Sequence, residues 1–260
     1  MRLAIDCGNT NTKFGLYDGT APGGRFVHVY RLDSDAGLSA DDYRARFDAE
    51  VSSAAIEAGA VTGAGLACVV PKARAALIDF AGALTGNDPV EIGAPRIDLG
   101  LKVLIQKPAE AGADRLAAAV GAHAGWPGTK IVLDFGTATT FDVVTAAGDY
   151  AGGIITPGVN LALDALHAGT AQLPRINVAK PDRLIGTSTV GAMESGIYWG
   201  YIGLIEGIVA RIRDEYPGEV TVIATGGLAA LFAEGAAVIN ATAPDLTLSG
   251  IILVLERNQP

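Results

Sequence analysis

Two stretches of the chain repeat one pattern of apolar and polar positions. In the first, an apolar run at residues 3–5 leads into a polar turn at 6–11 and an alternating run at 12–17. The second stretch, residues 131–144, has the same order of apolar run, Asp-x-Gly-Thr turn and return run. Two strand-like runs joined by Gly, Asn and Thr predict a β-hairpin. A hairpin repeated in each half of the chain predicts two similar domains.

Other periodic patterns supply the elements around these hairpins. Ser39 stands at an N-cap position, and Tyr43, Phe47 and Val51 follow at four-residue spacing, which predicts an amphipathic helix. Pro71 suits the first turn of a helix that extends to about residue 84. Further strands are predicted at 26–32, 66–70, 90–92, 101–105, 153–156 and 220–224, and further helices at 112–124, 159–168, 190–216, 228–234 and 246–255. The last stretch could also be a strand.

The order of these elements is that of an α/β protein with mixed sheets and helical crossovers. Its 260 residues suffice for one large or two small domains with hydrophobic cores. We place the boundary near residue 118, which gives domains 1–118 and 119–260. Within the predicted long helix, glycines recur at three- or four-residue spacing and predict a close contact with another helix or a second subunit. These are Gly196, Gly200, Gly203 and Gly207.

Composition narrows the class of protein. Half of the residues are hydrophobic and the mean hydropathy is +0.34, but no apolar run is long enough to span a bilayer. Two cysteines are too few for a disulfide framework or a zinc site. The net charge of −9 argues against a nucleic-acid partner. With a strand directly at the N-terminus we expect no signal peptide, no membrane association and a cytoplasmic location.

The turn of the first hairpin has a composition suited to phosphate. Gly8 lets the backbone approach a ligand, and successive N–H groups in such a turn form an anion site. Thr10 and Thr12 add hydroxyl donors, Lys13 adds a positive charge, and Asp6 offers a hard oxygen for Mg²⁺. Together they would suit a nucleoside triphosphate with its metal. The alternative is a polar hairpin turn without function.

Three further motifs offer chemistry. Asp114 begins a predicted helix and is followed by Arg115, so the pair is either a helix cap with a surface arginine or a general base beside an arginine that grips a carboxylate. Phosphoryl transfer needs such a proton acceptor and otherwise mainly positioning and charge neutralisation. Residues 225–227, Thr-Gly-Gly, would admit a nucleotide base or ribose, or simply begin a helix. The hydroxyls at 187–189 would cap the long helix or contact a substrate.

Together these motifs resemble the type III pantothenate kinase family, within the actin, sugar-kinase and Hsp70 superfamily. The similarity covers nearly the whole chain, and its strength lies in six motifs in the right order. They are Asp6-x-Gly8-Asn9-Thr10-x-x-Lys13, Val69-Val70-Pro71, Gly112-Ala113-Asp114-Arg115, Asp134-x-Gly136-Thr137-Ala138-Thr139, Gly152-Gly153 through Pro157-Gly158, and Thr225-Gly226-Gly227. The resemblance implies two similar actin-like (ribonuclease H-like) domains, each a mixed sheet flanked by helices, with a cleft between them.

The resemblance also implies the roles of individual residues. Asp114 corresponds to the proton acceptor, Asp134 to the ligand of a monovalent cation (K⁺ or NH₄⁺), and Asp6 to an indirect contact of Mg²⁺. The implied ATP-binding residues are Asp6, Cys7, Gly8, Asn9, Thr10, Asn11, Thr12, Lys13 and Thr137, and the implied substrate-binding residues are Gly112, Ala113, Asp114, Arg115 and Thr189. The family acts as a homodimer in which the partner subunit completes the substrate pocket.

The implied activity is ATP-dependent phosphorylation of pantothenate to 4'-phosphopantothenate, the first step of coenzyme A biosynthesis. One departure concerns Ile105, which stands where the family often has a substrate-contacting tyrosine. Two alternatives remain at this stage. One is a non-catalytic nucleotide-binding regulator on the same fold, and the other is a kinase or ATPase of the superfamily with a different substrate.

Overall fold

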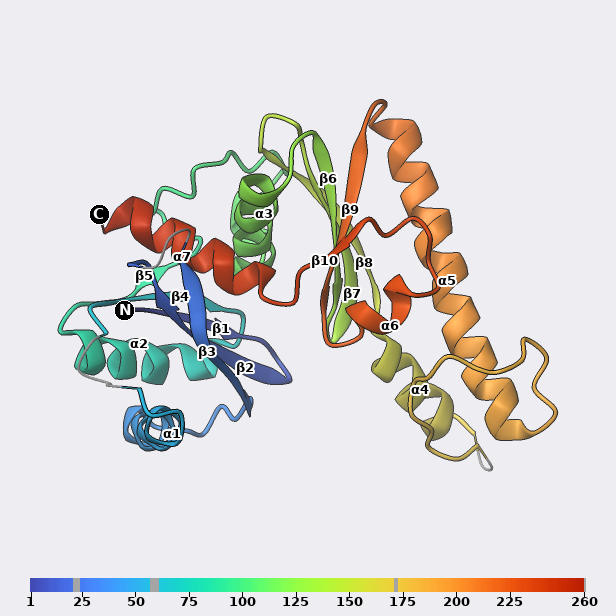
Figure 1. Ribbon diagram of the computed structural model, residues 1–260, viewed down its shortest axis with the longest axis horizontal. Helices are drawn as coiled ribbons and strands as arrows, with labels where there is room; N and C mark the ends of the chain where they lie inside the picture. The colour runs from blue at the N-terminus through green and yellow to red at the C-terminus, as the bar shows by residue number, and fades with distance from the viewer. Residues whose placement is uncertain (21–23, 57–60, 171–172, 260) are drawn as a thin grey trace. The chain divides into compact units, whose positions relative to one another are not determined.

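The chain builds one compact unit, passes into a second and returns to the first. The structure is a computed structural model that describes residues 1–20, 24–56, 61–170 and 173–259. The first unit comprises Met1–Gly125 and Asp245–Pro260, and the second comprises Trp126–Pro244. In Figure 1 the return is visible as the red C-terminal helix beside the blue and green elements of the first unit.

The sheet of the first unit has five strands in the order β3-β2-β1-β4-β5. The strands are β1 (Arg2–Cys7), β2 (Asn11–Asp18), β3 (Arg25–Asp33), β4 (Gly63–Cys68) and β5 (Val90–Glu91). The first three are antiparallel neighbours, whereas β4 and β5 add in parallel. A parallel strand requires a crossover connection, and helices supply it here.

Helices cover both faces of this sheet. On one face, α1 (Ala40–Ser53) and α2 (Pro71–Thr85) pack their buried side chains onto Phe14 and its neighbours in a common core. The predicted Ser39 cap is confirmed, because its side chain accepts from the Asp42 amide in a complete capping box. On the other face lies α7 (Leu246–Asn258), which packs against α3 (Ala113–Gly125). A short 3-10 helix, Pro108–Glu110, precedes α3.

The sheet of the second unit repeats the same topology. Its order is β10-β9-β6-β7-β8. Read from the other end, β8-β7-β6-β9-β10, it matches the order β3-β2-β1-β4-β5 of the first sheet, with each strand number raised by five. The strands are β6 (Thr129–Phe135), β7 (Ala138–Val144), β8 (Tyr150–Pro157), β9 (Val220–Gly226) and β10 (Ala241–Thr242). The predicted fold of two similar mixed sheets flanked by helices is therefore confirmed.

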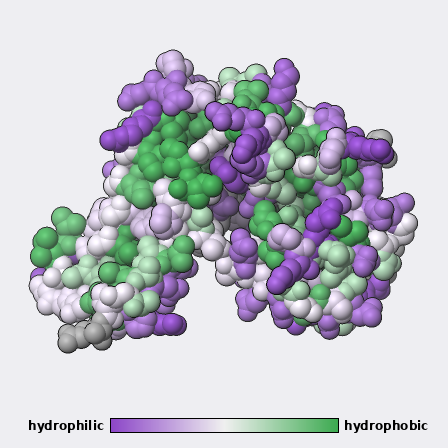
Figure 2. Space-filling model, turned by 180° about the vertical axis from the view of Figure 1, so that it is seen from behind, coloured by the Kyte–Doolittle hydropathy of each residue, from purple (hydrophilic) through white to green (hydrophobic). Residues whose placement is uncertain are grey.

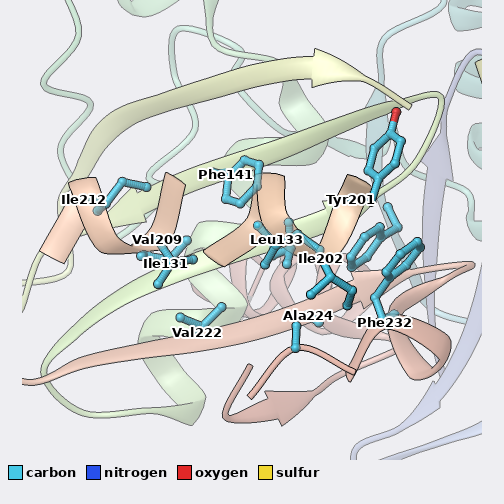
Figure 3. Packing of buried hydrophobic residues seen from close by; sticks show 14 of the residues in the cluster. Ile131, Leu133, Phe141, Tyr201, Ile202, Val209, Ile212, Val222, Ala224 and Phe232 are labelled. Atoms are coloured by element: carbon cyan, nitrogen blue, oxygen red, sulfur yellow. The ribbon is translucent and has the colours of Figure 1, made fainter. Parts of the chain in front are cut away.

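One hydrophobic cluster holds the second unit together. The inward-facing residues of β6, β7 and β9, among them Leu133 and Phe141, pack against α5 (Thr189–Glu215) and α6 (Ala229–Ala233). Figure 3 shows α5 side chains and Phe232 directed onto this face of the sheet. Helix α4 (Val159–Ala168) adds Val159 to the same cluster. Hydrophobic burial thus fixes the strands that carry the second hairpin turn.

The structure departs from the predicted elements in two places. Residues 101–105 do not form a strand; the chain there has only an isolated bridge at Val103. The domain division also differs from 1–118 and 119–260, because α3 continues without a break to Gly125 and α7 returns to the first unit. Local periodicity marks where a helix lies in the sequence, but it does not reveal which sheet the helix covers.

Two glycines allow α7 to pack closely against α3 in the first unit. A Cβ on Gly250 of α7 would collide with the backbone oxygen of Ala117 in α3, and a Cβ on Gly121 of α3 would lie 2.6 Å from the backbone oxygen of Leu246. The helices therefore touch backbone to backbone, which only residues without a side chain permit. The contact predicted for the glycines of the long helix is a different one: in the described chain nothing lies within 4 Å of a Cβ on Gly196, Gly200 or Gly203, so a contact with a second subunit there stays a prediction.

We expect Gly250→Ala to destabilise the protein by about 1–3 kcal/mol, because the added methyl group must push α3 and α7 apart. Gly125→Ala is the matched control, since no atom lies within 4 Å of its Cβ position at the end of α3. That change should be neutral or stabilising by up to about 1 kcal/mol. Urea unfolding followed by circular dichroism measures both variants, and equal stability of Gly250→Ala and the wild type would contradict the packing described.

Candidate active site

The first candidate loop is the turn between β1 and β2. The Gly8 amide donates to the Asn11 carbonyl over 3.0 Å and closes the turn, while Asn9 and Thr10 are exposed at its tip. Gly8 has little room for a side chain, since a Cβ would lie 3.3 Å from the Asn11 oxygen. The turn therefore presents backbone and short polar groups to its surroundings, as a phosphate-binding loop does.

Ser34, just after β3, anchors this loop. Its hydroxyl donates to the Gly8 carbonyl over 2.6 Å, and its amide donates to the Thr10 carbonyl over 2.9 Å. The Thr12 hydroxyl lies 3.0 Å from the Ser34 hydroxyl. Three hydrogen-bonding contacts thus fix the turn from behind. Ser34 follows an ordinary strand pattern, so nothing in the sequence singles it out.

Two residues of this segment, Thr12 and Cys7, are directed into the protein interior. The buried Thr12 hydroxyl donates to the Cys7 sulfur over 3.5 Å, and Cys7 is buried opposite Cys68 in the β1–β4 register. A hydrogen bond with Cys68 lowers the pKa of the Cys7 thiol and raises the pKa of Cys68. The Thr12 hydroxyl, expected from the sequence to meet phosphate, is instead engaged in holding the loop.

Asp6 and Lys13 face each other across the base of the hairpin. They are register partners in the antiparallel β1–β2 pair, so their side chains leave the same face of the sheet. The Lys13 ammonium also forms an ion pair of 2.7 Å with Asp245, directly before α7. A carboxylate and an ammonium thus stand together beside the turn, which suits a metal–phosphate group.

The second candidate loop lies between β6 and β7. The Gly136 amide donates to the Ala138 carbonyl over 3.0 Å, and Asp134 is the next-to-last residue of β6, as Asp6 is of β1. Gly136 and Thr137 are exposed at the tip. The turn has one residue fewer between its last register pair, Phe135 and Thr139, than the first turn has between Cys7 and Thr12. The two hairpins are therefore alike in plan but not identical.

Two further glycines enclose the second loop. A Cβ on Gly158 would collide with the Thr137 backbone oxygen, and a Cβ on Gly226 would lie 2.5 Å from Asp134 Oδ1. Gly226 also has φ of +89°, a conformation that glycine adopts without strain. These contacts explain the Pro-Gly and Thr-Gly-Gly motifs, because each lets the backbone close around Asp134 and Thr137.

Asp114 and Arg115 begin α3 in a half-buried position. Asp114 Oδ1 accepts from the Arg115 amide over 2.8 Å, and a Cβ on Gly112 would lie 2.5 Å from the same oxygen. Gly112 therefore makes room for the carboxylate at the first turn of the helix. Ile105, at the position that is often tyrosine in the family, is half-buried in the preceding segment.

Thr189 is the first residue of α5, next to the capping residue Ser188. It lines an apolar pocket of about 430 Å³ between α4 and α5. The other lining residues are Leu166, Leu173, Ala192, Met193, Gly196 and Ile197.

Candidate metal ligands in the described part of the chain are single carboxylates beside the glycine turns. No three His, Cys, Asp or Glu side chains cluster there as a metal site. Mg²⁺ in nucleotide enzymes is typically held by one or two carboxylates together with the substrate phosphates. Asp6 and Asp134, each beside a glycine turn, fit that pattern as single oxygen ligands.

Comparisons with known proteins agree with this arrangement. The family model of type III pantothenate kinase matches residues 2–211. Relatives named type III pantothenate kinase include one from Phenylobacterium zucineum, 45% identical over 259 residues with 100% of this chain and 99% of the relative covered. Another, from Rhodospirillum rubrum, is 46% identical over 260 residues and the whole of both chains.

Solved structures show the same fold at low sequence identity. An activator of 2-hydroxyisocaproyl-CoA dehydratase from Clostridium difficile, with bound ADPNP, aligns with a TM-score of 0.55 at 12% identity, covering 98% of this chain and 94% of the other. A candidate 2-dehydro-3-deoxygalactonokinase from Sinorhizobium meliloti gives a TM-score of 0.60 at 12% identity over the whole of both chains. From the match along most of the chain and the full-length relatives, it follows that this protein belongs to the type III pantothenate kinase family.

Proposed function

We propose that the chain transfers the terminal phosphoryl group of ATP to the primary hydroxyl of pantothenate and so produces 4'-phosphopantothenate for coenzyme A synthesis. Family membership supports the activity, and the single observation that carries the mechanism is the pair of hairpins with an acidic residue before each glycine turn. A cytoplasmic location fits such a biosynthetic enzyme. Among the described helices, none has both the length and the apolarity to cross a bilayer.

For nucleotide binding we assign the backbone of residues 6–13 and the exposed Thr137 to the phosphates of ATP. The first turn, fixed by Ser34, needs little reorganisation to present its amides. Lys13 would neutralise phosphate charge, and Mg²⁺ bound to ATP would approach Asp6 through water. Asp134, enclosed by Gly226, would hold K⁺ or NH₄⁺ as a single carboxylate ligand. A bound metal would supply charge neutralisation at the phosphates.

For the chemical step we assign Asp114 as the group that accepts the pantothenate hydroxyl proton. Gly112 leaves its carboxylate room, and the Arg115 amide hydrogen bond fixes its orientation. Arg115 would bind the pantothenate carboxylate through two parallel hydrogen bonds, which its planar guanidinium favours. The hydroxyl oxygen then attacks the γ-phosphorus, the bond to ADP breaks, and the proton passes to Asp114.

The active enzyme is, in this proposal, a homodimer with α5 at the interface. Among the described residues, nothing lies within 4 Å of a Cβ on Gly196, Gly200 or Gly203, so this side of α5 is open. Large apolar side chains are exposed on the same unit, and Figure 2 shows hydrophobic surface there. They include Ile155, Leu161, Leu184, Ile185 and Val190. A second copy would cover them and complete the pocket at Thr189, since exposed apolar surface of this kind marks interaction sites.

We expect Asp114→Asn to lower kcat by about 10²–10⁴-fold, the usual contribution of a general base. The amide still accepts the Arg115 hydrogen bond, so thermal stability and ATP binding should remain unchanged. Glu110→Gln is the control, because this exposed carboxylate ends the 3-10 helix before α3 and pairs with Lys107. Steady-state assays of ADP release measure both variants, and near-normal turnover of Asp114→Asn would refute the assigned base.

Gly226→Ala should raise the K⁺ concentration needed for half-maximal activity. The new methyl group would press on Asp134, and the left-handed backbone costs a non-glycine residue about 1–2 kcal/mol. The backbone cost lowers stability, whereas the displacement of Asp134 weakens cation binding, so we expect a severalfold shift in the K⁺ requirement with the thermal stability followed in parallel. Gly227→Ala is the matched control, because nothing lies within 4 Å of its Cβ position. An unchanged K⁺ dependence in Gly226→Ala would remove Asp134 from the cation site.

Gly200→Arg should convert the homodimer into folded monomers. The side chain meets open space in one chain but would collide with a partner helix packed on α5. Light scattering after size-exclusion chromatography distinguishes the 26.5-kDa chain from its dimer. Gly125→Arg, at the open end of α3, is the control and should leave the dimer intact. A monomeric wild type, or a dimer that tolerates Gly200→Arg, would contradict the interface.

A further inference from the structure

We propose that Asp245 is a positioning residue that holds the Lys13 ammonium beside the first loop and so prepares it for nucleotide. The inference rests on the proposed role of residues 6–13 in binding ATP. Its starting point is the 2.7 Å ion pair between Lys13 Nζ and Asp245 Oδ1, which joins residues 232 positions apart. The Lys13 side chain is only 13% exposed, so the pair is partly shielded from water.

The packing of α7 places Asp245 at this end of the hairpin. Lys13 and Gly15 are two residues apart on β2 and so lie on one face of the sheet. A Cβ on Gly15 would lie 2.9 Å from Leu248 Cδ1, and a Cβ on Gly65 would lie 2.5 Å from Ile251 Cγ2. Helix α7 therefore lies directly on this face, with its first turn toward Lys13. Asp245 is also the first residue of the first unit after the chain returns from the second.

Asp245 does not serve the helix that it precedes. It occupies the N-cap position, where aspartate normally accepts a backbone hydrogen bond and contributes about 1 kcal/mol. Here its side chain makes no capping hydrogen bond, and its φ of −110° and ψ of 21° depart from the usual extended cap. The carboxylate is directed to Lys13 instead. The Asp245 carboxylate is 39% exposed, and an ion pair with one partner open to solvent contributes only about 0–1 kcal/mol to stability, so stability alone does not explain the arrangement.

The function that we assign to this ion pair is to order the Lys13 side chain before the nucleotide binds. A lysine side chain carries about 2 kcal/mol of rotamer entropy, and ordering it before the ligand arrives lowers the cost of binding. The ammonium has three donors, of which the carboxylate takes one in this pair. Lys13 stands opposite Asp6, so an ammonium fixed here lies at the base of the proposed phosphate loop. Asp245 thus neutralises part of the charge of the Lys13 ammonium, but it also fixes the position of this ammonium beside the loop.

The test compares MgATP binding to the full-length wild type and Asp245→Asn by calorimetry, without pantothenate. We expect Asp245→Asn to weaken binding by about two- to tenfold, the cost of ordering one flexible side chain, and to raise KM for ATP but not for pantothenate. Lys13→Met should weaken binding further, and adding Asp245→Asn to it should have no additional effect. Asp98→Asn is the matched control, since it removes the ion pair with Arg257 near the other end of α7.

A second readout does not depend on nucleotide. The ion pair should slow the reaction of the Lys13 amine with an amine-specific reagent, so Asp245→Asn should speed this labelling severalfold by mass spectrometry while Asp98→Asn should not. The inference would be overturned if Asp245→Asn left the labelling rate unchanged, or if it left MgATP binding unchanged or made it tighter. It would also be overturned if Asp245→Asn weakened MgATP binding equally in the wild type and in the Lys13→Met background. If labelling accelerates but the wild type does not bind MgATP, the positioning of Lys13 stands and the proposed function fails.

Discussion

The candidate site depends on one constraint at the second hairpin turn and at the start of α3: backbone must approach backbone or carboxylate more closely than a side chain allows. At the second turn, Gly158 and Gly226 make room for Thr137 and Asp134. At the start of α3, Gly112 does the same for Asp114. A methyl group on any one of these three glycines would displace the residue that it faces. The glycines therefore determine where the proposed chemical groups stand, and the two hydrophobic cores keep the strands that carry them in register.

The same topology, built twice, explains how one chain offers two similar turns. In each sheet an antiparallel hairpin is extended on one side by a third strand and on the other by two parallel strands. In both hairpins the acidic residue is the next-to-last residue of the first strand, which gives Asp6 and Asp134 equivalent places. The surroundings then differ, because Lys13 pairs with Asp6 across the first hairpin whereas Thr140 pairs with Asp134 across the second. Such a difference is consistent with two distinct roles on one repeated framework.

Much of the fold and part of the candidate site could be predicted from the sequence, because the patterns that indicate them lie within short stretches of the chain. Alternating apolar positions revealed the hairpins, Ser39 revealed its helix, and the glycine motifs revealed the turns. What could not be predicted depends on partners far apart in the chain. Ser34 donates a hydrogen bond to Gly8, 26 positions away in the sequence, and Asp245 pairs with Lys13, 232 positions away. Neither Ser34 nor Asp245 belongs to a sequence motif. The return of α7 to the first sheet was missed for the same reason, as was the inward direction of Thr12.

Phosphoryl transfer to pantothenate distinguishes a pantothenate kinase from a nucleotide-binding regulator on the same fold. The most direct measurement incubates the purified wild type with MgATP and pantothenate, with and without K⁺ or NH₄⁺, and follows both ADP and phosphorylated pantothenate. We expect equal amounts of ADP and 4'-phosphopantothenate, with turnover that depends on the monovalent cation. ATP binding without any phosphorylated pantothenate under these conditions would contradict this expectation.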